Sequence, residues 1–141
     1  MLTEPLEMKS PVRATPRYSV LIVDDDAVMV DVLSRRLDRQ GFGTLVADSG
    51  KLALELARSK RPDCILLDLR LPDVDGFDLC QDLVDSHETN EIPVIIVSGL
   101  DQPDIVRRSR AAGCQYYVRK PYDPNALLTL IRQAIDEARE Q

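Results

Sequence analysis

Five polar side chains lie at or just after the ends of short apolar runs, and their types suggest one kind of chemistry. Carboxylates bind divalent cations, a hydroxyl donates to an oxyanion, and an ammonium pairs with the negative charge of a phosphoryl group. Three acids together with a lysine and a serine are therefore typical of phosphoryl transfer. These side chains belong to Asp24, Asp25, Asp68, Ser98 and Lys120.

The segments that must position these side chains alternate between two patterns. Short β-rich runs span residues 20–23, 44–47, 64–67, 94–97 and 116–118. Amphipathic helical patterns span residues 27–40, 50–60, 77–86, 102–112 and 124–138. Apolar runs without alternation, such as Cys64–Leu67, suit strands that are covered on both faces. We therefore expect an α/β fold with a doubly wound, five-stranded parallel sheet of order 2-1-3-4-5, flanked by five helices.

Composition narrows the function classes. The chain has 141 residues, which suits one domain, and its 24 acidic against 18 basic residues give a net charge of −6. Direct binding to nucleic acid is not expected at this charge. Residues 1–17 contain Pro5, Pro11 and Pro16 without an apolar period, so we expect a flexible leader there and the folded domain over residues 18–141.

Redox state and location also follow from residue usage. The three cysteines, Cys64, Cys80 and Cys114, have spacings that match neither a zinc site nor a paired redox motif. They are expected to be reduced, packed thiols. No apolar run is long enough for a membrane span, and Glu4 and Glu7 interrupt the region where a secretory signal would lie. The sequence thus favours a cytoplasmic protein.

The acids should meet at one edge of the sheet. With strands one and three adjacent, Asp24 and Asp25 face Asp68 at the carboxyl ends of the strands, where ligands bind in such folds. Two carboxylates about 4 Å apart repel by roughly 4 kcal/mol at an effective dielectric near 20. A divalent cation removes this repulsion, and an all-oxygen ligand set favours Mg²⁺, or Mn²⁺ in its place, over zinc.

Four segments in the same order resemble the receiver domain of two-component response regulators, the CheY-like fold. The resemblance covers about Tyr18 to the C-terminus. The segments are LIVDD at 21–25, LLDLRLPDVDG at 66–76, IVSG at 96–99 and YVRKP at 117–121.

This resemblance implies the role of each site residue. Asp68 would be the phosphoacceptor, with Asp25 as a direct Mg²⁺ ligand, Asp24 holding the ion partly through water, and the main-chain oxygen of Arg70 as a further ligand. The resemblance also implies roles for three further residues around the phosphoryl group. Ser98 would bind a phosphoryl oxygen, Lys120 would pair with the phosphoryl charge, and Tyr117 would turn inward as Ser98 moves. A cis peptide between Lys120 and Pro121 is implied as well.

The same resemblance implies the biological role. A sensor histidine kinase or a histidine phosphotransfer protein would donate the phosphoryl group to Asp68, and the chain would catalyse only its own phosphorylation and dephosphorylation. The output partner is unknown, no membrane is involved, and phosphorylation-dependent dimerisation stays open. The surface that responds would be the fourth helix, fifth strand and fifth helix, with Ile105, Arg107, Arg108, Tyr117 and Arg119.

Two other functions compete with this interpretation. A phosphatase of the haloacid-dehalogenase type would use Asp24 as nucleophile and Asp26 as general acid. It also needs a later strand that ends in paired acids, but only a helix is expected after Lys120, and Asp26 suits the cap of the first helix better. A receiver-like module that is never phosphorylated is the second.

Two further signals do not indicate a site. Asp73 and Asp75 lie in a stretch that fits a calcium loop poorly, and His87 is expected in a solvated loop.

Overall fold

The computed structural model describes residues 17–101 and 103–140, and within them all five strands form one parallel sheet. The strand order is β2-β1-β3-β4-β5, as predicted. The strands are β1 (Ser19–Val23), β2 (Gly43–Ala47), β3 (Cys64–Leu67), β4 (Val94–Ser98) and β5 (Tyr116–Arg119). The helices are α2 (Ala27–Arg39), α3 (Gly50–Lys60), α4 (Gly76–Asp85), α5 (Ile105–Ala111) and α6 (Pro124–Arg139).

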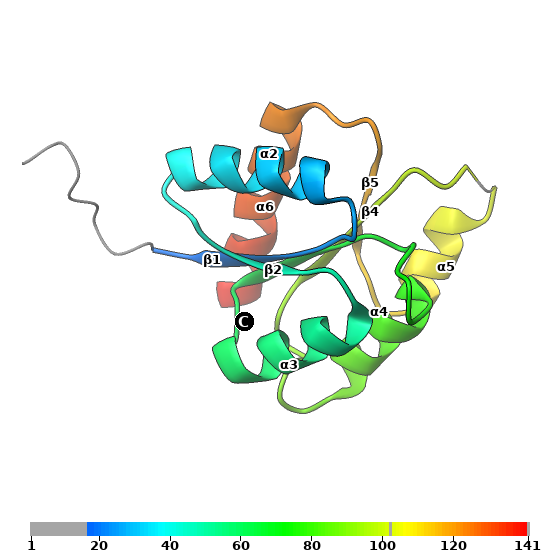
Figure 1. Cartoon of the computed structure of the whole chain (residues 1–141). Helices are drawn as coiled ribbons and strands as arrows, with labels where there is room; N and C mark the ends of the chain where they lie inside the picture. Colours follow the sequence, from blue (N-terminus) through cyan, green and yellow to red (C-terminus); the bar gives the residue numbers. More distant parts are fainter. Residues whose placement is uncertain (1–16, 102, 141) are drawn as a thin grey trace, which may run out of the picture.

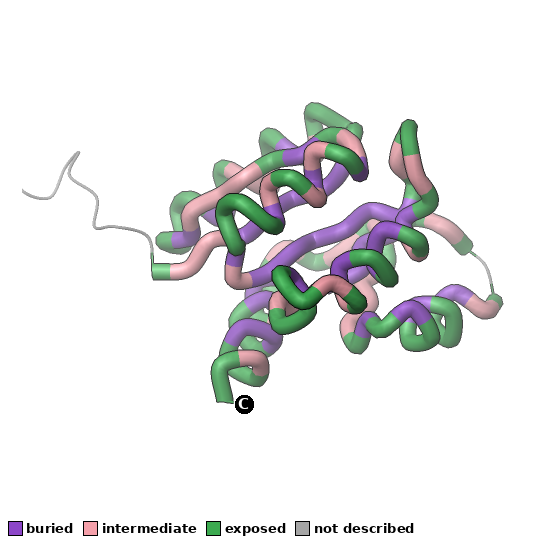
Figure 2. The backbone as a smooth tube through the Cα atoms, turned by 90° about the horizontal axis from the view of Figure 1, so that it is seen from below, coloured by how far each residue is buried: buried purple, intermediate pink, exposed green. Residues whose placement is uncertain are grey.

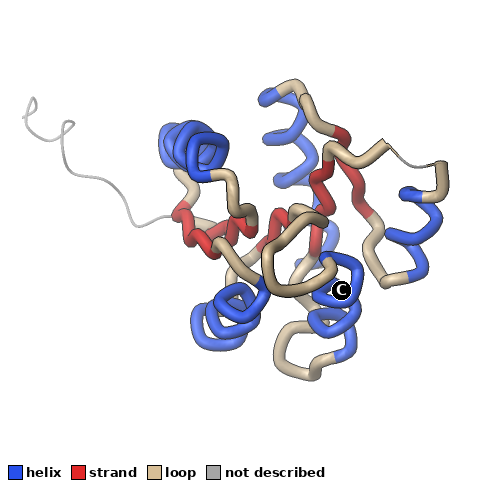
Figure 3. The backbone as a smooth tube through the Cα atoms, turned by 45° about the vertical axis from the view of Figure 1, so that its right-hand side comes forward, coloured by secondary structure: helices blue, strands red, loops and turns tan. Residues whose placement is uncertain are grey.

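The helices cover both faces of the sheet. Helices α2 and α6 lie on one face, and α3, α4 and α5 lie on the other (Figures 1 and 3). Side chains of alternate strand residues point to opposite faces, so Val20 and Ile22 pack with α2 and α6, whereas Leu21 and Val23 pack on the other side. Strands β1, β3 and β4 are accordingly the most continuously buried part of the chain, whereas the edge strands β2 and β5 are mostly half-buried (Figure 2). This burial on both faces explains the uninterrupted apolar runs.

Short polar side chains begin most of the helices. The Asp26 carboxylate accepts hydrogen bonds from the amides of Val28 and Met29 and so caps α2, as predicted. Gly41 follows α2 with φ of 91°, the left-handed conformation expected of it. These local signals fix the direction in which each strand feeds the next helix.

Helix α5 is shorter than predicted. The pattern indicated a helix from residue 102, but the helix begins at Ile105 after a turn over residues 103 and 104. Asp104 has φ of −101° and ψ of 12°, and its side chain does not cap the helix. The segment is the least apolar of the five, so packing supports only the part that places Ile105 and Ser109 against the core.

The prediction of three reduced cysteines is wrong for two of them. Cys80 and Cys114 form a disulfide, whereas Cys64 is a free, buried thiol whose pKa is raised by that burial. The bonded pair is 34 residues apart in the chain. Spacing alone gave no sign of it, because only the packing of α4 against the turn after α5 brings the two residues together.

The predicted leader falls almost entirely outside the described residues. Of residues 1–17 only Arg17 is described, and its guanidinium lies 5.2 Å from the centre of the Tyr18 ring. No helix in the described ranges has the length and hydropathy of a bilayer-spanning segment.

Glycine is required where α4 begins. A Cβ atom on Gly76 would lie 2.4 Å from the Cα atom of Leu69, and the Gly76 amide donates to the Leu69 carbonyl over 3.1 Å. Arg70 and Asp75 form a β-bridge inside the same loop. The loop that follows β3 is therefore closed tightly on itself.

Gly76→Ala is expected to destabilise the fold by about 1–3 kcal/mol, because the added methyl group forces the loop backbone apart. Gly99→Ala is the matched control, since a Cβ there would lie 3.9 Å from the Cβ of Lys120 and change stability by less than about 1 kcal/mol. Urea unfolding of both variants measures the difference. Equal stability of the two would contradict the close approach at Gly76.

Candidate phosphoryl-transfer site

The predicted site residues converge at the carboxyl edge of the sheet. The strand hydrogen-bond ladders continue into the site: the amide of Asp24 donates to Ala47, that of Asp68 to Val23, and that of Lys120 to the carbonyl of Ser98. Each site residue thus leaves its strand in a fixed direction. Asp24 and Asp68 are each only 8% exposed, whereas Asp25 is exposed.

Lys120 joins the two buried acids. Its Nζ atom lies 2.9 Å from Oδ2 of Asp24 and 3.6 Å from Oδ2 of Asp68. The other oxygen of Asp24 accepts from the amide of Asp26, and the other oxygen of Asp68 accepts from the amide of Arg70 over 3.3 Å. One ammonium and two main-chain amides therefore hold two carboxylates whose strands are neighbours in the sheet.

The charges at the site shift the proton affinities of its groups. Burial raises the pKa of Asp68, and the nearby Asp24 carboxylate raises it as well, while Lys120 opposes both effects. Burial alone would lower the pKa of Lys120, but its contacts with Asp24 and Asp68 raise it further than burial lowers it. Lys120 is consequently held protonated, and Asp68 keeps its proton to a higher pH than a free aspartate.

The acids form a donor set suited to a hard cation. Asp24, Asp25 and Asp68 each place one carboxylate oxygen so that all three atoms lie within 4.8 Å of one another. The donors are oxygens without histidine or thiolate, which is the chemistry that Mg²⁺ requires. The residues present therefore fit the metal. Arg70 lies in the loop beside Asp68, and its amide donates to Oδ1 of Asp68.

Ser98 and Tyr117 lie on the two neighbouring strands. Ser98 ends β4, is fully buried, and accepts a hydrogen bond from the Leu100 amide over 3.0 Å. Tyr117 in β5 packs against the apolar cluster beneath α4 and α5, and Tyr116 packs on the opposite face. The peptide bond between Lys120 and Pro121 is cis, as the sequence resemblance implied.

Two residues at the site were not identified from the sequence. Tyr122 and Met29 line a cavity of about 20 Å³ together with Asp24, Asp68 and Lys120, enough for about one water molecule. Burial raises the pKa of the Tyr122 hydroxyl. The position of Tyr122, two residues after Lys120, is the one signal in the sequence that it lies near the site.

The Asp73 carboxylate caps a helix that is distant in the sequence. Its two oxygens accept from the amides of Gly50 and Lys51, at 2.8 and 3.1 Å, at the start of α3. These hydrogen bonds lower the pKa of Asp73. Asp75 meanwhile accepts from the amide of Phe77 and caps α4. Both acids serve helix ends, which agrees with the rejection of a calcium loop here.

The surface expected to respond to phosphorylation differs from the prediction at Ile105. Ile105 is only 5% exposed and packs in the core, because it is the first apolar contact of the short helix α5. Arg107 and Arg119 are exposed, but each lies near an acid, Asp104 at 3.9 Å and Asp101 at 3.2 Å. The guanidinium of Arg108 stacks over the ring of Phe77 at 4.3 Å. The surface is basic, with much of its charge already paired.

Comparison with known proteins identifies the family. The sequence model of the response regulator receiver domain family matches residues 20–132, which include every site residue described above. The chain belongs to the response regulator receiver family. It is 33% identical over 120 residues to the polar-differentiation response regulator DivK of Brucella anthropi, covering 85% of this chain and 98% of that protein. His87, as expected, is exposed and lies outside the site of this receiver domain.

Solved receiver structures agree with the fold. A CheY-like receiver domain protein from Methanospirillum hungatei superposes with a TM-score of 0.82 at 27% identity, covering 87% of this chain and 97% of that one. The receiver domain of a sensor histidine kinase from Pseudomonas aeruginosa superposes with a TM-score of 0.77 at 24% identity, covering 84% and 98%. That second structure has a magnesium ion coordinated in its active site cleft.

Mg²⁺ is expected to stabilise the receiver domain in a way that depends on pH. At ten times its Kd the ion adds about 1.4 kcal/mol to the unfolding free energy. Because the raised pKa of Asp68 lets protons compete, the Kd should rise about tenfold for each pH unit below that pKa. Thermal melts with and without Mg²⁺ across pH measure both effects.

Asp68→Asn should abolish most of this Mg²⁺-dependent shift. It should also raise the melting temperature in the absence of Mg²⁺, because it removes a buried charge that Asp24 repels. Asp136→Asn, an exposed acid on α6, is the matched control and should keep the wild-type response. A shift of wild-type size in Asp68→Asn would refute the assigned ligand set.

Asp73→Asn is expected to lower the melting temperature, since an amide can accept only one of the two helix-end hydrogen bonds. The pKa of Asp73 is lowered in the folded protein, so its stabilisation is present above the ordinary aspartate pKa and is lost as the pH falls through the lowered value. The variant should therefore differ from wild type at neutral pH and converge with it in strong acid. Asp82→Asn, which changes an exposed acid on α4, is the control and should leave the melting temperature unchanged both at neutral pH and in strong acid.

Proposed function

We propose that Asp68 is the phosphoacceptor of this receiver domain and that residues 18–141 act as its phosphorylation-controlled switch. The observation that carries the proposal is the contact of one ammonium, Lys120, with both Asp24 and Asp68 at the carboxyl edge of the sheet. Receiver domains act with sensor histidine kinases and output partners. Here the donor is a histidine kinase or a histidine phosphotransfer protein.

The reaction is an in-line displacement at phosphorus. A carboxylate oxygen of Asp68 forms a bond to the phosphorus of the donor's phosphohistidine, while the bond from phosphorus to the imidazole nitrogen breaks and the nitrogen keeps the electron pair. The raised pKa of Lys120 keeps its ammonium charged, and Nζ lies 3.6 Å from the acceptor oxygen. Lys120 is thus placed to offset charge on the transferring oxygens.

Asp24, Asp25, Asp68 and the main-chain oxygen of Arg70 would hold Mg²⁺. The bound ion supplies positive charge that offsets the acids and the phosphoryl oxygens. The magnesium in the cleft of the Pseudomonas receiver supports this assignment. Mn²⁺ suits the same oxygen donors.

Phosphorylation would act on the structure through Ser98. A phosphoryl group on Asp68 offers a new acceptor to the Ser98 hydroxyl, whose oxygen now accepts from the Leu100 amide. Tyr117 lies on the neighbouring strand, in register with Ile96, and would turn inward as Ser98 moves. The surface formed by α5, β5 and α6 would change for a partner protein, which fits a cytoplasmic signalling role.

The rival phosphatase mechanism is not favoured by the geometry. It requires Asp26 as a general acid, but the Asp26 carboxylate accepts two amide hydrogen bonds at the start of α2. It also leaves the contact between Lys120 and Asp68 without a role. We therefore treat the domain as a signalling module that catalyses only its own phosphorylation and dephosphorylation.

With acetyl phosphate and Mg²⁺, the wild-type chain is expected to gain one hydroxylamine-sensitive phosphoryl group, because an acyl phosphate forms on Asp68. Asp68→Asn should gain none, whereas Asp48→Asn, an exposed acid after β2 at the same edge, should react normally. Intact mass spectrometry measures the change. Hydrolysis of p-nitrophenyl phosphate lost in Asp24→Asn but kept in Asp68→Asn would favour the phosphatase, and an unmodified wild type would favour a module that is never phosphorylated.

A further inference from the structure

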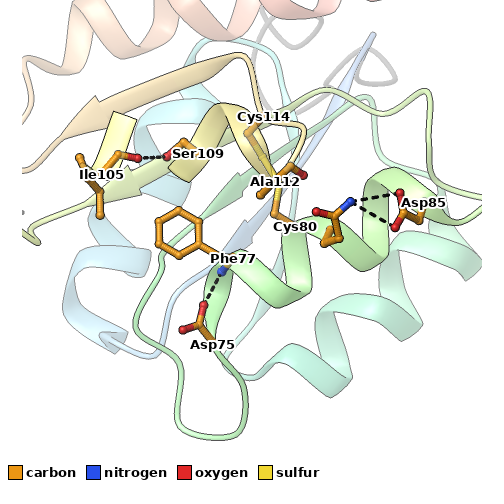
Figure 4. The surroundings of a disulfide bond; sticks show 9 residues. Asp75, Phe77, Cys80, Asp85, Ile105, Ser109, Ala112 and Cys114 are labelled. Atoms are coloured by element: carbon orange, nitrogen blue, oxygen red, sulfur yellow. Dashed lines mark hydrogen bonds between the residues drawn. A yellow bond between two sulfur atoms is a disulfide. The ribbon is translucent and has the colours of Figure 1, made fainter. Parts of the chain in front are cut away.

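A disulfide ties helix α4 to the turn that follows α5. Cys80 and Cys114 form it, with Cα atoms 7.1 Å apart and exposed fractions of 0% and 2%. Figure 4 shows the bond between the two segments, close to the ring of Phe77 and the carbonyl of Ala112. The sulfur atoms belong to the apolar cluster that also contains Ile105 and that Tyr117 packs against.

The bond encloses the part of the chain that phosphorylation would move. The ring closed by Cys80 and Cys114 contains β4, Ser98 and the whole of α5. Ser98 lies at one end of the segment that carries α5, and Cys114 lies at the other. When Ser98 moves toward a phosphoryl group, α5 can follow only as far as its attachment at Cys114 permits.

Noncovalent contacts hold the same end of α5 more weakly. A Cβ on Gly113 would lie 2.8 Å from a methyl carbon of Val84 in α4, so the turn presses directly on that helix. Arg108 stacks over Phe77 of α4 through an exposed cation. Helix α5 has only seven residues and lacks a side-chain cap, and the residues that it buries in the core are Ile105 and Ser109. The disulfide is the one covalent restraint between α4 and this turn in the described part of the chain.

In the disulfide-bonded structure the Ser98 side chain is enclosed by its neighbours. It is fully buried, and its oxygen accepts from the Leu100 amide. A phosphoryl group on Asp68 would offer the Ser98 hydroxyl a new acceptor, because the hydroxyl can donate while its oxygen accepts from Leu100. The movement of Ser98 toward that acceptor is the step that the disulfide would resist.

We propose that Cys80 and Cys114 are a redox-active pair that controls how strongly phosphorylation of Asp68 is coupled to α5. The inference rests on the proposed function of Asp68. Oxidation locks the end of α5 on α4 and weakens the response, and reduction releases it. A ligand that prefers the released arrangement must in turn favour the reduced pair.

The oxidant is a small-molecule disulfide such as glutathione disulfide. Cys114 directly follows the turn at residues 112 and 113, so its thiolate attacks one sulfur of the oxidant when this segment opens, which forms a mixed disulfide and releases one thiol. The Cys80 thiolate then attacks the Cys114 sulfur, which forms the Cys80–Cys114 bond and releases the second thiol. The pair loses two electrons and two protons, and the oxidant is reduced to two thiols.

The first experiment counts thiols. The folded chain is equilibrated in mixtures of reduced and oxidised glutathione, quenched with acid, unfolded and alkylated, and its mass is measured. One alkylated residue, Cys64, is expected in the oxidised form and three in the reduced form. Stable glutathione adducts on Cys80 or Cys114, or three free thiols under all conditions, would overturn the proposal.

The second experiment measures coupling with beryllofluoride, a phosphoryl mimic, in the presence of Mg²⁺. The oxidised wild type should bind it at least about threefold more weakly than the reduced form, and residues 105–115 should exchange amide hydrogens more slowly when oxidised. By reciprocity, saturating beryllofluoride should shift the glutathione ratio at half-oxidation by the same factor toward reduction.

Variants separate the pair from general effects of oxidation. Cys80→Ala and Cys114→Ala should each bind beryllofluoride like the reduced wild type, whatever the glutathione ratio. Cys64→Ala removes an equally buried thiol in the other apolar cluster and should retain the full redox effect. Both cysteines are replaced, each in its own variant, so that the test can still be made if one of the two variants fails to fold.

The outcomes distinguish this inference from the assignment of Asp68. Equal affinity and equal hydrogen exchange in both redox states would overturn the redox inference and leave the phosphoacceptor intact. Failure of both redox forms to bind beryllofluoride would overturn the phosphoacceptor and, with it, the coupling proposed here. In that case the thiol count and hydrogen exchange would show only whether the pair restrains α5.

Discussion

The mutual repulsion of carboxylates at the carboxyl edge of the sheet is the constraint on which the site depends. Asp24 and Asp68 leave neighbouring strands, and burial of both would be unfavourable without positive charge between them. Lys120 provides part of that charge and binds both acids, yet the pKa of Asp68 remains raised. The two acids are therefore only partly neutralised by Lys120, so the site favours binding of further positive charge. A divalent cation can supply that charge.

The backbone around the acids is held in place by contacts that have no direct part in the proposed reaction. The close approach of Gly76 to Leu69 closes the loop after β3, and the Asp73 carboxylate ties that loop to the start of α3. These contacts keep Asp68 and Arg70 in register with the end of β1. The loop is thus rigid where the acceptor is carried, as an in-line reaction requires.

Rigidity is unequal on the two faces of the sheet. The face covered by α2 and α6 is filled by large buried side chains from long helices, such as Leu37 and Ile131. On the other face α4 also buries large side chains, such as Leu79 and Leu83, but α5 has only seven residues, and one disulfide ties the segment after it to α4. Because a short helix with few anchors moves at little cost, this face is the natural place for a switch, and the disulfide lies where it can limit that movement.

The sequence by itself determined the order of elements, the sheet topology and the polar residues expected at the carboxyl edge of the sheet. These features follow from local patterns: apolar strand runs, the Asp26 cap, the turn at Gly41, and polar residues at the carboxyl ends of strands. Tertiary structure alone decided several other contacts between distant groups. The Cys80–Cys114 bond, the capping of α3 by Asp73, the burial of Ile105 and the late start of α5 all depend on how helices pack across long separations in the chain. Local spacing contains no information on such contacts, because each partner looks ordinary until packing places the other beside it.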